Sequence, residues 1–113
     1  MKFYTNDSKA ILIALSGSDE NLREIKAGTT DAAVEKHVPV YEVNDGKVCV
    51  KVGSVEHPMQ DAHYIEWVAV QTDKGFYTKF LRPSEKPEAC FAVDGENIEA
   101  VYAYCNLHGL WKA

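Results

Sequence analysis

The sequence lacks the features that mark several classes of protein. Its 113 residues carry a net charge of −5 with no cluster of lysine or arginine, which argues against a nucleic-acid partner. The longest apolar run, Ala10–Leu15, is far too short to cross a membrane. No basic segment followed by a long apolar run comes after Met1, so we also expect no secretory signal. With 46% hydrophobic and 26% charged residues, the composition is that of a globular domain and excludes a disordered or collagen-like chain.

Cysteine is scarce, with only Cys49, Cys90 and Cys105. An odd number without paired spacing argues against a disulfide framework and is typical of a protein of the reducing cytoplasm. Cys49 and Cys90 lie within predicted strands and have no neighbouring histidine. We therefore expect these two to pack in the interior rather than to bind a metal, and we predict a cytoplasmic location.

Residues 34–113 have the pattern of an all-β domain. Strands predicted at 38–43 and 47–52 flank Asn44-Asp-Gly46, a hairpin signal. Short strands at a spacing of about 8–12 residues, with no convincing helix, predict a two-sheet sandwich. The further predicted strands are 62–70, 76–81, 89–93 and 98–104.

Residues 1–33 differ from the rest because they contain no cysteine, histidine, tryptophan or proline. A short strand is predicted at 10–15, a polar turn at 16–20, and either a strand or one helical turn at 21–27. About thirty residues are too few for an independent core without disulfides or metal. We therefore expect a small β appendage that leans on the main domain or on a second subunit.

The four histidines and one cysteine share a context, because all five lie in predicted loops or at strand ends. Taken singly, each has an ordinary interpretation as a hydrogen-bonded histidine or a small buried thiol. A cysteine and a histidine three residues apart in a loop can bind one metal, and together the five indicate a shared metal site. They are His37, His57, His63, Cys105 and His108.

The five donors leave three candidate metals: zinc, copper and iron. A structural zinc site closes with four ligands, so five donors are one too many. Blue copper takes two histidines, one cysteine and a weak axial ligand, but no methionine follows Cys105 and two histidines are left over. Iron with five protein ligands keeps one open position, and a thiolate opposite that position would push electron density toward it.

Four motifs, in order over about eighty residues, resemble the iron domain of the desulfoferrodoxin and neelaredoxin family, the superoxide reductases. The resemblance implies an immunoglobulin-like β-sandwich. It also implies a mononuclear non-haem iron centre with His37, His57, His63 and His108 in a plane and Cys105 as the axial ligand. The motifs are Glu35-Lys-His-Val-Pro39, Val52-Gly-Ser-Val-Glu-His-Pro-Met59, His63-Tyr-Ile-Glu-Trp67 and Cys105-Asn-Leu-His-Gly109.

The activity implied by this resemblance is one-electron reduction of superoxide to hydrogen peroxide. Glu35 corresponds to the carboxylate that closes the sixth iron position after oxidation. Lys36 corresponds to the cation that attracts superoxide and helps to protonate the bound product. Without the resemblance, Glu35 and Lys36 would be interpreted as a solvated charge pair. A net charge of −5 repels an anion, so capture requires a local positive field, which can dominate within roughly 8–10 Å at physiological salt.

The N-terminal segment departs from the family's two-iron members, which carry a rubredoxin-like site with four cysteine ligands. No cysteine precedes Cys49, so residues 1–33 resemble a metal-free remnant of that domain, joined by a connector at 26–33. The resemblance then implies an external electron donor such as rubredoxin, and a homodimer. Two other classes stay open: a copper-binding electron carrier, and a module in which zinc only holds the loops together.

Overall fold

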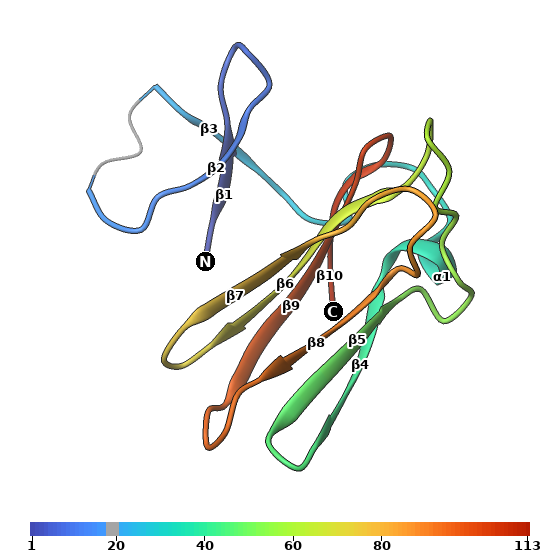
Figure 1. Ribbon diagram of the computed structural model, residues 1–113. Coiled ribbons are helices and arrows are strands. Elements are labelled where there is room, and N and C mark those ends of the chain that lie inside the picture. The colour runs from blue at the N-terminus through green and yellow to red at the C-terminus, as the bar shows by residue number, and fades with distance from the viewer. Residues whose placement is uncertain (18–20) are drawn as a thin grey trace.

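The chain folds into three antiparallel sheets (Figure 1), which confirms the all-β class. The computed structural model describes residues 1–17 and 21–113. The sheet orders are β2-β1-β3, β10-β9-β6-β7 and β4-β5-β8. The elements are β1 (Phe3–Thr5), β2 (Ile11–Ile13), β3 (Arg23–Ile25), α1 (Val34–His37), β4 (Pro39–Asn44), β5 (Lys47–Val52), β6 (Ile65–Thr72), β7 (Phe76–Phe80), β8 (Glu88–Ala92), β9 (Ile98–Cys105) and β10 (Gly109–Lys112).

The core lies between the β4-β5-β8 sheet and the β10-β9-β6-β7 sheet, as in a sandwich. Strand β5 alternates strictly, so that Val48, Val50 and Val52 face inward while the residues between them face solvent. These valines pack with Val68 of β6 and Val101 of β9 in one cluster of buried residues. Burial of these apolar side chains is the main force that holds the two sheets together.

The N-terminal sheet covers the other face of the β10-β9-β6-β7 sheet. Phe3 of β1 is buried there, with its ring centroid 4.7 Å from that of Tyr102 and 5.6 Å from that of Trp67. Strands β2 and β3 lie inside the predicted segments 10–15 and 21–27, whereas β1 was not predicted. The predicted turn at 16–20 includes residues 18–20, which lie outside the described residues.

The predicted hairpin is confirmed, with Asn44 paired to Lys47 across a two-residue turn. Asp45 and Gly46 both have positive φ, of 50° and 76°, as a type I′ turn requires. The predicted strand at 62–70 begins only at Ile65, because the preceding segment forms a separate bridge between Gln60 and His63. Strand β10 was not predicted, because its four residues are too few for a periodic pattern.

The expectation of no helix is wrong for one turn, α1, which is the only helix among the described residues. Val38 N donates to Val34 O at 3.0 Å, and Pro39 then prevents the helix from continuing. Four residues are too short to give a periodic signal in the sequence. Over residues 1–17 and 21–113, no helix is long and apolar enough to span a membrane.

The expectation that Cys49 and Cys90 are free, interior cysteines is wrong. The two are joined by a disulfide, with Cα atoms 4.1 Å apart. They oppose each other in the register of β5 and β8. Both side chains are exposed, because in each strand the residues before and after the cysteine point toward the core. A separation of 41 residues gives no local signal, since only the strand register brings the pair together. The cysteine count therefore no longer supports a reducing compartment.

Candidate metal site

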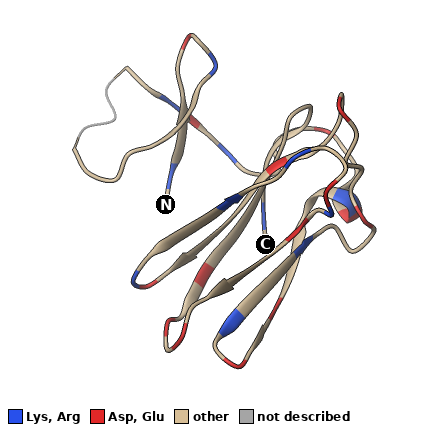
Figure 2. Cartoon of the chain, in the orientation of Figure 1, with Lys and Arg blue, Asp and Glu red and all other residues tan. Residues whose placement is uncertain are grey.

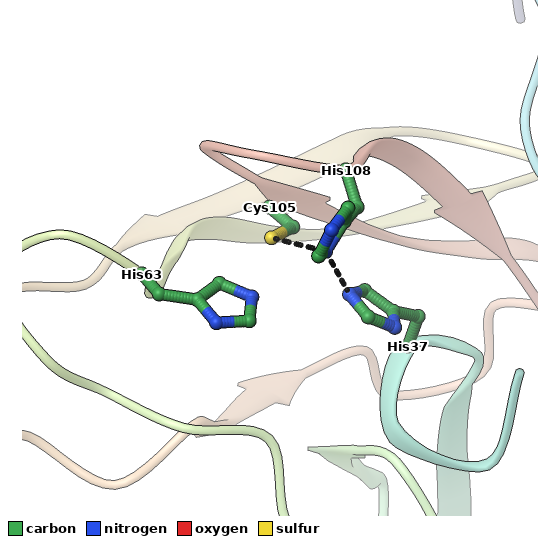
Figure 3. Close-up of side chains that lie close together, drawn as sticks. All are labelled: His37, His63, Cys105 and His108. Carbon is green, nitrogen blue, oxygen red and sulfur yellow. Dashed lines mark hydrogen bonds between the residues drawn. The ribbon is translucent and has the colours of Figure 1, made fainter. Parts of the chain in front are cut away.

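Four imidazoles and one thiol from three parts of the chain, α1, the β5–β6 connection and the β9–β10 hairpin, meet at one end of the sandwich. Figure 3 shows His37, His63, Cys105 and His108 grouped together, and their ligand atoms all lie within 4.8 Å of one another. His57 adjoins this group, with its Nε2 3.2 Å from Nε2 of His37 and its ring centroid 4.7 Å from that of His63. The structure thus brings together all five residues predicted as ligands.

Backbone pairing places these residues at a common end. The start of β6 pairs with the end of β9, so that Ile65 opposes Cys105. His63 lies two residues before Ile65. His37 is the last residue of α1, and His57 N donates to Val52 O at the end of β5 at 3.2 Å. His108 lies in the turn that leads from β9 to β10.

Hydrogen bonds fix the orientation of two of the rings. Nδ1 of His37 lies 2.7 Å from Ala33 O, and Nδ1 of His57 lies 2.7 Å from Pro58 O. A carbonyl can only accept, so each Nδ1 carries the proton and donates. Each Nε2 is then left with a lone pair that points into the group, as in metal-binding histidines whose other nitrogen is held by a carbonyl.

Burial keeps these imidazoles neutral. It lowers the pKa of His57 from 6.5 to about 4, and it also lowers the pKa of His37 and of His63. A neutral imidazole has one proton, which His37 and His57 already use toward the carbonyls. Two lone pairs therefore face each other across 3.2 Å, and Nδ1 of His108 lies 3.0 Å from Nε2 of His37 (Figure 3). A cation shared by these nitrogens would make the arrangement favourable.

The other donors also fit a metal ion. Among the described residues, Nε2 of His63 is buried with no hydrogen-bond partner, a costly state for a polar atom. Cys105 is fully buried, and burial raises the pKa of its thiol. A thiolate here needs a compensating cation, and a coordinating metal deprotonates a thiol outright. Nδ1 of His108 lies 3.8 Å from Cys105 Sγ and completes the donor set.

Glu35 and Lys36 lie on α1 directly before His37, and both are exposed. Figure 2 shows this turn carrying acidic and basic residues side by side. Next to burial, both charges have small effects: the charge of Glu35 raises the pKa of His37, that of Lys36 lowers it less, and Lys36 also slightly lowers the pKa of His63. An open depression beside His57 is lined by two cations, Lys36 and Lys86, and by two carboxylates, Glu56 and Glu85.

Two supporting residues were also missed in the sequence. The side chain of Asn106 accepts a hydrogen bond from Tyr64 N at 2.9 Å and donates to Ala62 O at 3.1 Å, which ties the Cys105 turn to the His63 segment. Trp111 Nε1 donates to His108 O at 3.1 Å, and its ring centroid lies 4.8 Å from that of His37. Their closeness in sequence to the ligands was a signal, but their partners could be found only in the fold.

The fold and the donors together define a β-sandwich protein with a metal site rich in imidazole and containing one thiol. The profile of the desulfoferrodoxin family matches residues 29–113, and the chain belongs to this family. A desulfoferrodoxin of Desulfarculus baarsii is 46% identical over 95 residues, which cover 84% of this chain and 75% of that protein. A desulfoferrodoxin homologue of Archaeoglobus fulgidus is 50% identical over 97 residues, 86% of this chain and 75% of that protein.

Solved structures support the same relationship, one of them along the whole chain. The superoxide reductase of Treponema pallidum is 41% identical and superposes with a TM-score of 0.83, covering 100% of this chain and 99% of that one. The one-iron superoxide reductase of Giardia intestinalis is 31% identical with a TM-score of 0.60, covering 70% of this chain and 95% of that one. The similarity to the first structure includes the N-terminal sheet.

Proposed function

We propose that this chain is a superoxide reductase that converts superoxide to hydrogen peroxide by one-electron reduction. The observation that carries the proposal is the meeting of His37, His57, His63, His108 and Cys105, in a chain 41% identical to a superoxide reductase over its full length. The metal that we propose is one iron ion per chain. Bound ferrous iron would supply the single electron that superoxide accepts.

The protein's own residues would set the conditions for this reaction. The inward Nε2 atoms of His37 and His57 are already oriented by their carbonyl partners, so little reorganisation is needed to bind the ion. Cys105 Sγ, held as a thiolate, would contribute negative charge from the buried side. Because the donors come from three separate parts of the chain, the fold itself fixes their mutual geometry.

Residues on the exposed side of the group would attract the superoxide anion and supply protons to the product. We propose that Lys36 Nζ attracts superoxide against the overall charge of −5 and holds a proton where the product needs one. Glu35, its neighbour on α1, would complete the ligand set of the oxidised protein. Both residues are exposed, so a small ligand from solvent can reach them.

The source of electrons follows from the same reasoning. No cysteine precedes Cys49, so residues 1–33 cannot hold a four-cysteine iron site. The proposal therefore includes an external donor, rubredoxin or a similar small electron carrier. The cytoplasmic location, the homodimer and the boundary between units 1–33 and 34–113 stay predictions.

The test is elemental analysis of protein purified without oxygen, followed by superoxide kinetics. We expect one iron per chain and superoxide consumption with release of peroxide. Copper or zinc that iron cannot replace would contradict the proposal and favour the electron carrier or the zinc module.

Substitution of the thiol ligand adds a spectroscopic test with a matched control. Cys105→Ser should abolish the visible thiolate-to-ferric absorption, since that band requires a sulfur ligand. The double variant Cys49→Ser/Cys90→Ser removes the other two cysteine sulfurs, which lie outside the group, and should keep the band. If the band survived in Cys105→Ser, Cys105 would not be a ligand.

A further inference from the structure

The Cys49–Cys90 disulfide lies on the outer face of the β4-β5-β8 sheet, apart from the candidate metal group. The two cysteines are directly opposed in the register of β5 and β8, which run side by side (Figure 1). Both are exposed, whereas Val48 and Val50, on either side of Cys49, are fully buried or nearly so. Solvent and solutes can therefore reach the sulfur atoms without movement of the core.

The fold does not depend on this bond for strand pairing. Five register pairs join β5 to β8, from Lys47–Ala92 to Lys51–Glu88, and the disulfide adds a covalent link in the middle. Val48, Val50 and Ala89 hold the same strands to the core by burial. The sheet can therefore keep its pairing when the sulfur–sulfur bond opens.

Charges of both signs surround Cys49. Lys47 and Lys51 lie two residues before and after it, on the same exposed face of β5. They are offset by Glu42, which is paired with Cys49 in the β4–β5 register, and by Glu88, which is paired with Lys51 in the β5–β8 register. Charge therefore does not select one sulfur of the disulfide, and access decides which one is attacked.

A shallow groove gives access to one of the two sulfur-bearing residues. It is lined by Val40, Tyr41, Glu42, Cys49 and Lys51, so it lies over β4 and β5 and reaches Cys49 rather than Cys90. An incoming thiol that lies in the groove therefore meets Cys49 first. The Cys90 sulfur then stands on the far side, in the position of the leaving group.

We propose that Cys49–Cys90 is a second redox site, which dithiols open and hydroperoxides close. In the opening reaction, a thiolate of the dithiol attacks Cys49 Sγ, the sulfur–sulfur bond breaks, and Cys90 leaves as a thiolate. The second thiol of the reductant then attacks the mixed disulfide and releases Cys49. The pair gains two electrons and two protons, and the dithiol is oxidised to its own disulfide.

The closing reaction uses one molecule of hydroperoxide. Cys49 thiolate attacks the peroxide, the oxygen–oxygen bond breaks, and Cys49 becomes a sulfenic acid. Cys90 then attacks that sulfur and displaces water, which restores the disulfide. With hydrogen peroxide the sum is two thiols and one peroxide giving one disulfide and two waters. Because the peroxide can be added from outside, this inference does not rest on the proposed superoxide chemistry.

The test is differential alkylation of the full-length native protein, read by peptide mass spectrometry. After dithiothreitol, iodoacetamide labelling of Cys49 and Cys90 should rise from near zero to near completion, while buried Cys105 stays unlabelled. One equivalent of hydrogen peroxide should return the labelling to its starting level. Labelling that needs a denaturant, labelling of Cys105 in parallel, or no reclosure by peroxide would each overturn the proposal.

Single variants test the greater access that the groove gives to Cys49. Cys90→Ser leaves Cys49 as the single thiol of this face, and Cys49→Ser leaves Cys90. With oxidised glutathione as the probe, Cys90→Ser should form its mixed disulfide several times faster than Cys49→Ser. Equal rates, or the reverse order, would show that the groove does not direct the exchange.

Discussion

Gly53→Ala should disturb the candidate metal site although Gly53 has no polar side chain. Gly53 follows β5, is buried, and has a φ of +87°. A Cβ at this position would collide with the carbonyl oxygen of Val55, and would lie 2.7 Å from that of Lys36 and 2.8 Å from that of Glu35. All three atoms are backbone, so none can move aside by rotation of a side chain.

The loss of stability expected for Gly53→Ala has two parts that can be separated. A non-glycine residue in the left-handed region costs about 1–2 kcal/mol. An added methyl group that forces a backbone shift in a packed region costs about 1–3 kcal/mol more. Gly53→Ala should therefore lower the free energy of unfolding by about 2–5 kcal/mol. Since the collision lies between α1, which carries His37, and the loop that leads to His57, the shift should also weaken metal binding.

Gly95→Ala is the matched control. Gly95 has a φ of +73° but nothing within 4 Å of its Cβ position, so the substitution costs only the backbone part. We expect urea unfolding to show a loss of about 1–2 kcal/mol for Gly95→Ala with full iron content. Gly53→Ala should show the larger loss together with lower iron content and a changed absorption spectrum. Equal losses and equal iron contents in the two variants would refute this reasoning.

Three further outcomes can be checked. Lys36→Met should slow superoxide capture by about tenfold and flatten its dependence on salt, while Lys47→Met should not; stopped-flow rates that are the same in both would refute steering. Hydrogen bonds from Thr72 and then Tyr77 lower the pKa of Glu96 below 4.5, so its stabilisation should be present above pH 4.5 and be lost as the pH falls further. Glu96→Gln should therefore be less stable than wild type at pH 7, with a gap that closes on acidification in thermal melts; a gap independent of pH would contradict this. Chelation of the metal should lower the melting temperature, because the inward imidazole lone pairs lose their shared cation, and an unchanged melt would argue against a metal there.

The sequence predicted the parts of the fold that depend on local patterns. The hairpin around Asp45-Gly46 is visible because positive φ restricts the residues that can occupy it. Strand β5 is visible because Val48, Val50 and Val52 alternate with exposed residues. Strands β1 and β10 escaped prediction because three or four residues give no measurable period, although each pairs with a strand close to it in the sequence.

The candidate site was predictable for a different reason. Its donors are rare residues in short motifs, so the four histidines and Cys105 could be named before any geometry was known. The disulfide was not predictable, because it depends on the alignment of β5 with β8, and one residue of slippage would send Cys49 to the opposite face. Register is a global property of the sandwich, whereas a ligand motif is a local one.

The residues between the ligands explain why the motifs extend beyond the donors themselves. Gly53 permits the close approach of α1 to the loop before His57, and Val55 N donates to Glu35 O at 3.0 Å across that junction. Asn106 links the Cys105 turn to the His63 segment through its side-chain amide. These ties continue the contacts between neighbouring segments beyond the ends of the strand ladders, so they hold the donors in place before a metal binds. The geometry of the site is thus built largely by backbone hydrogen bonds, and a substitution at such a position can impair metal binding without removing a ligand.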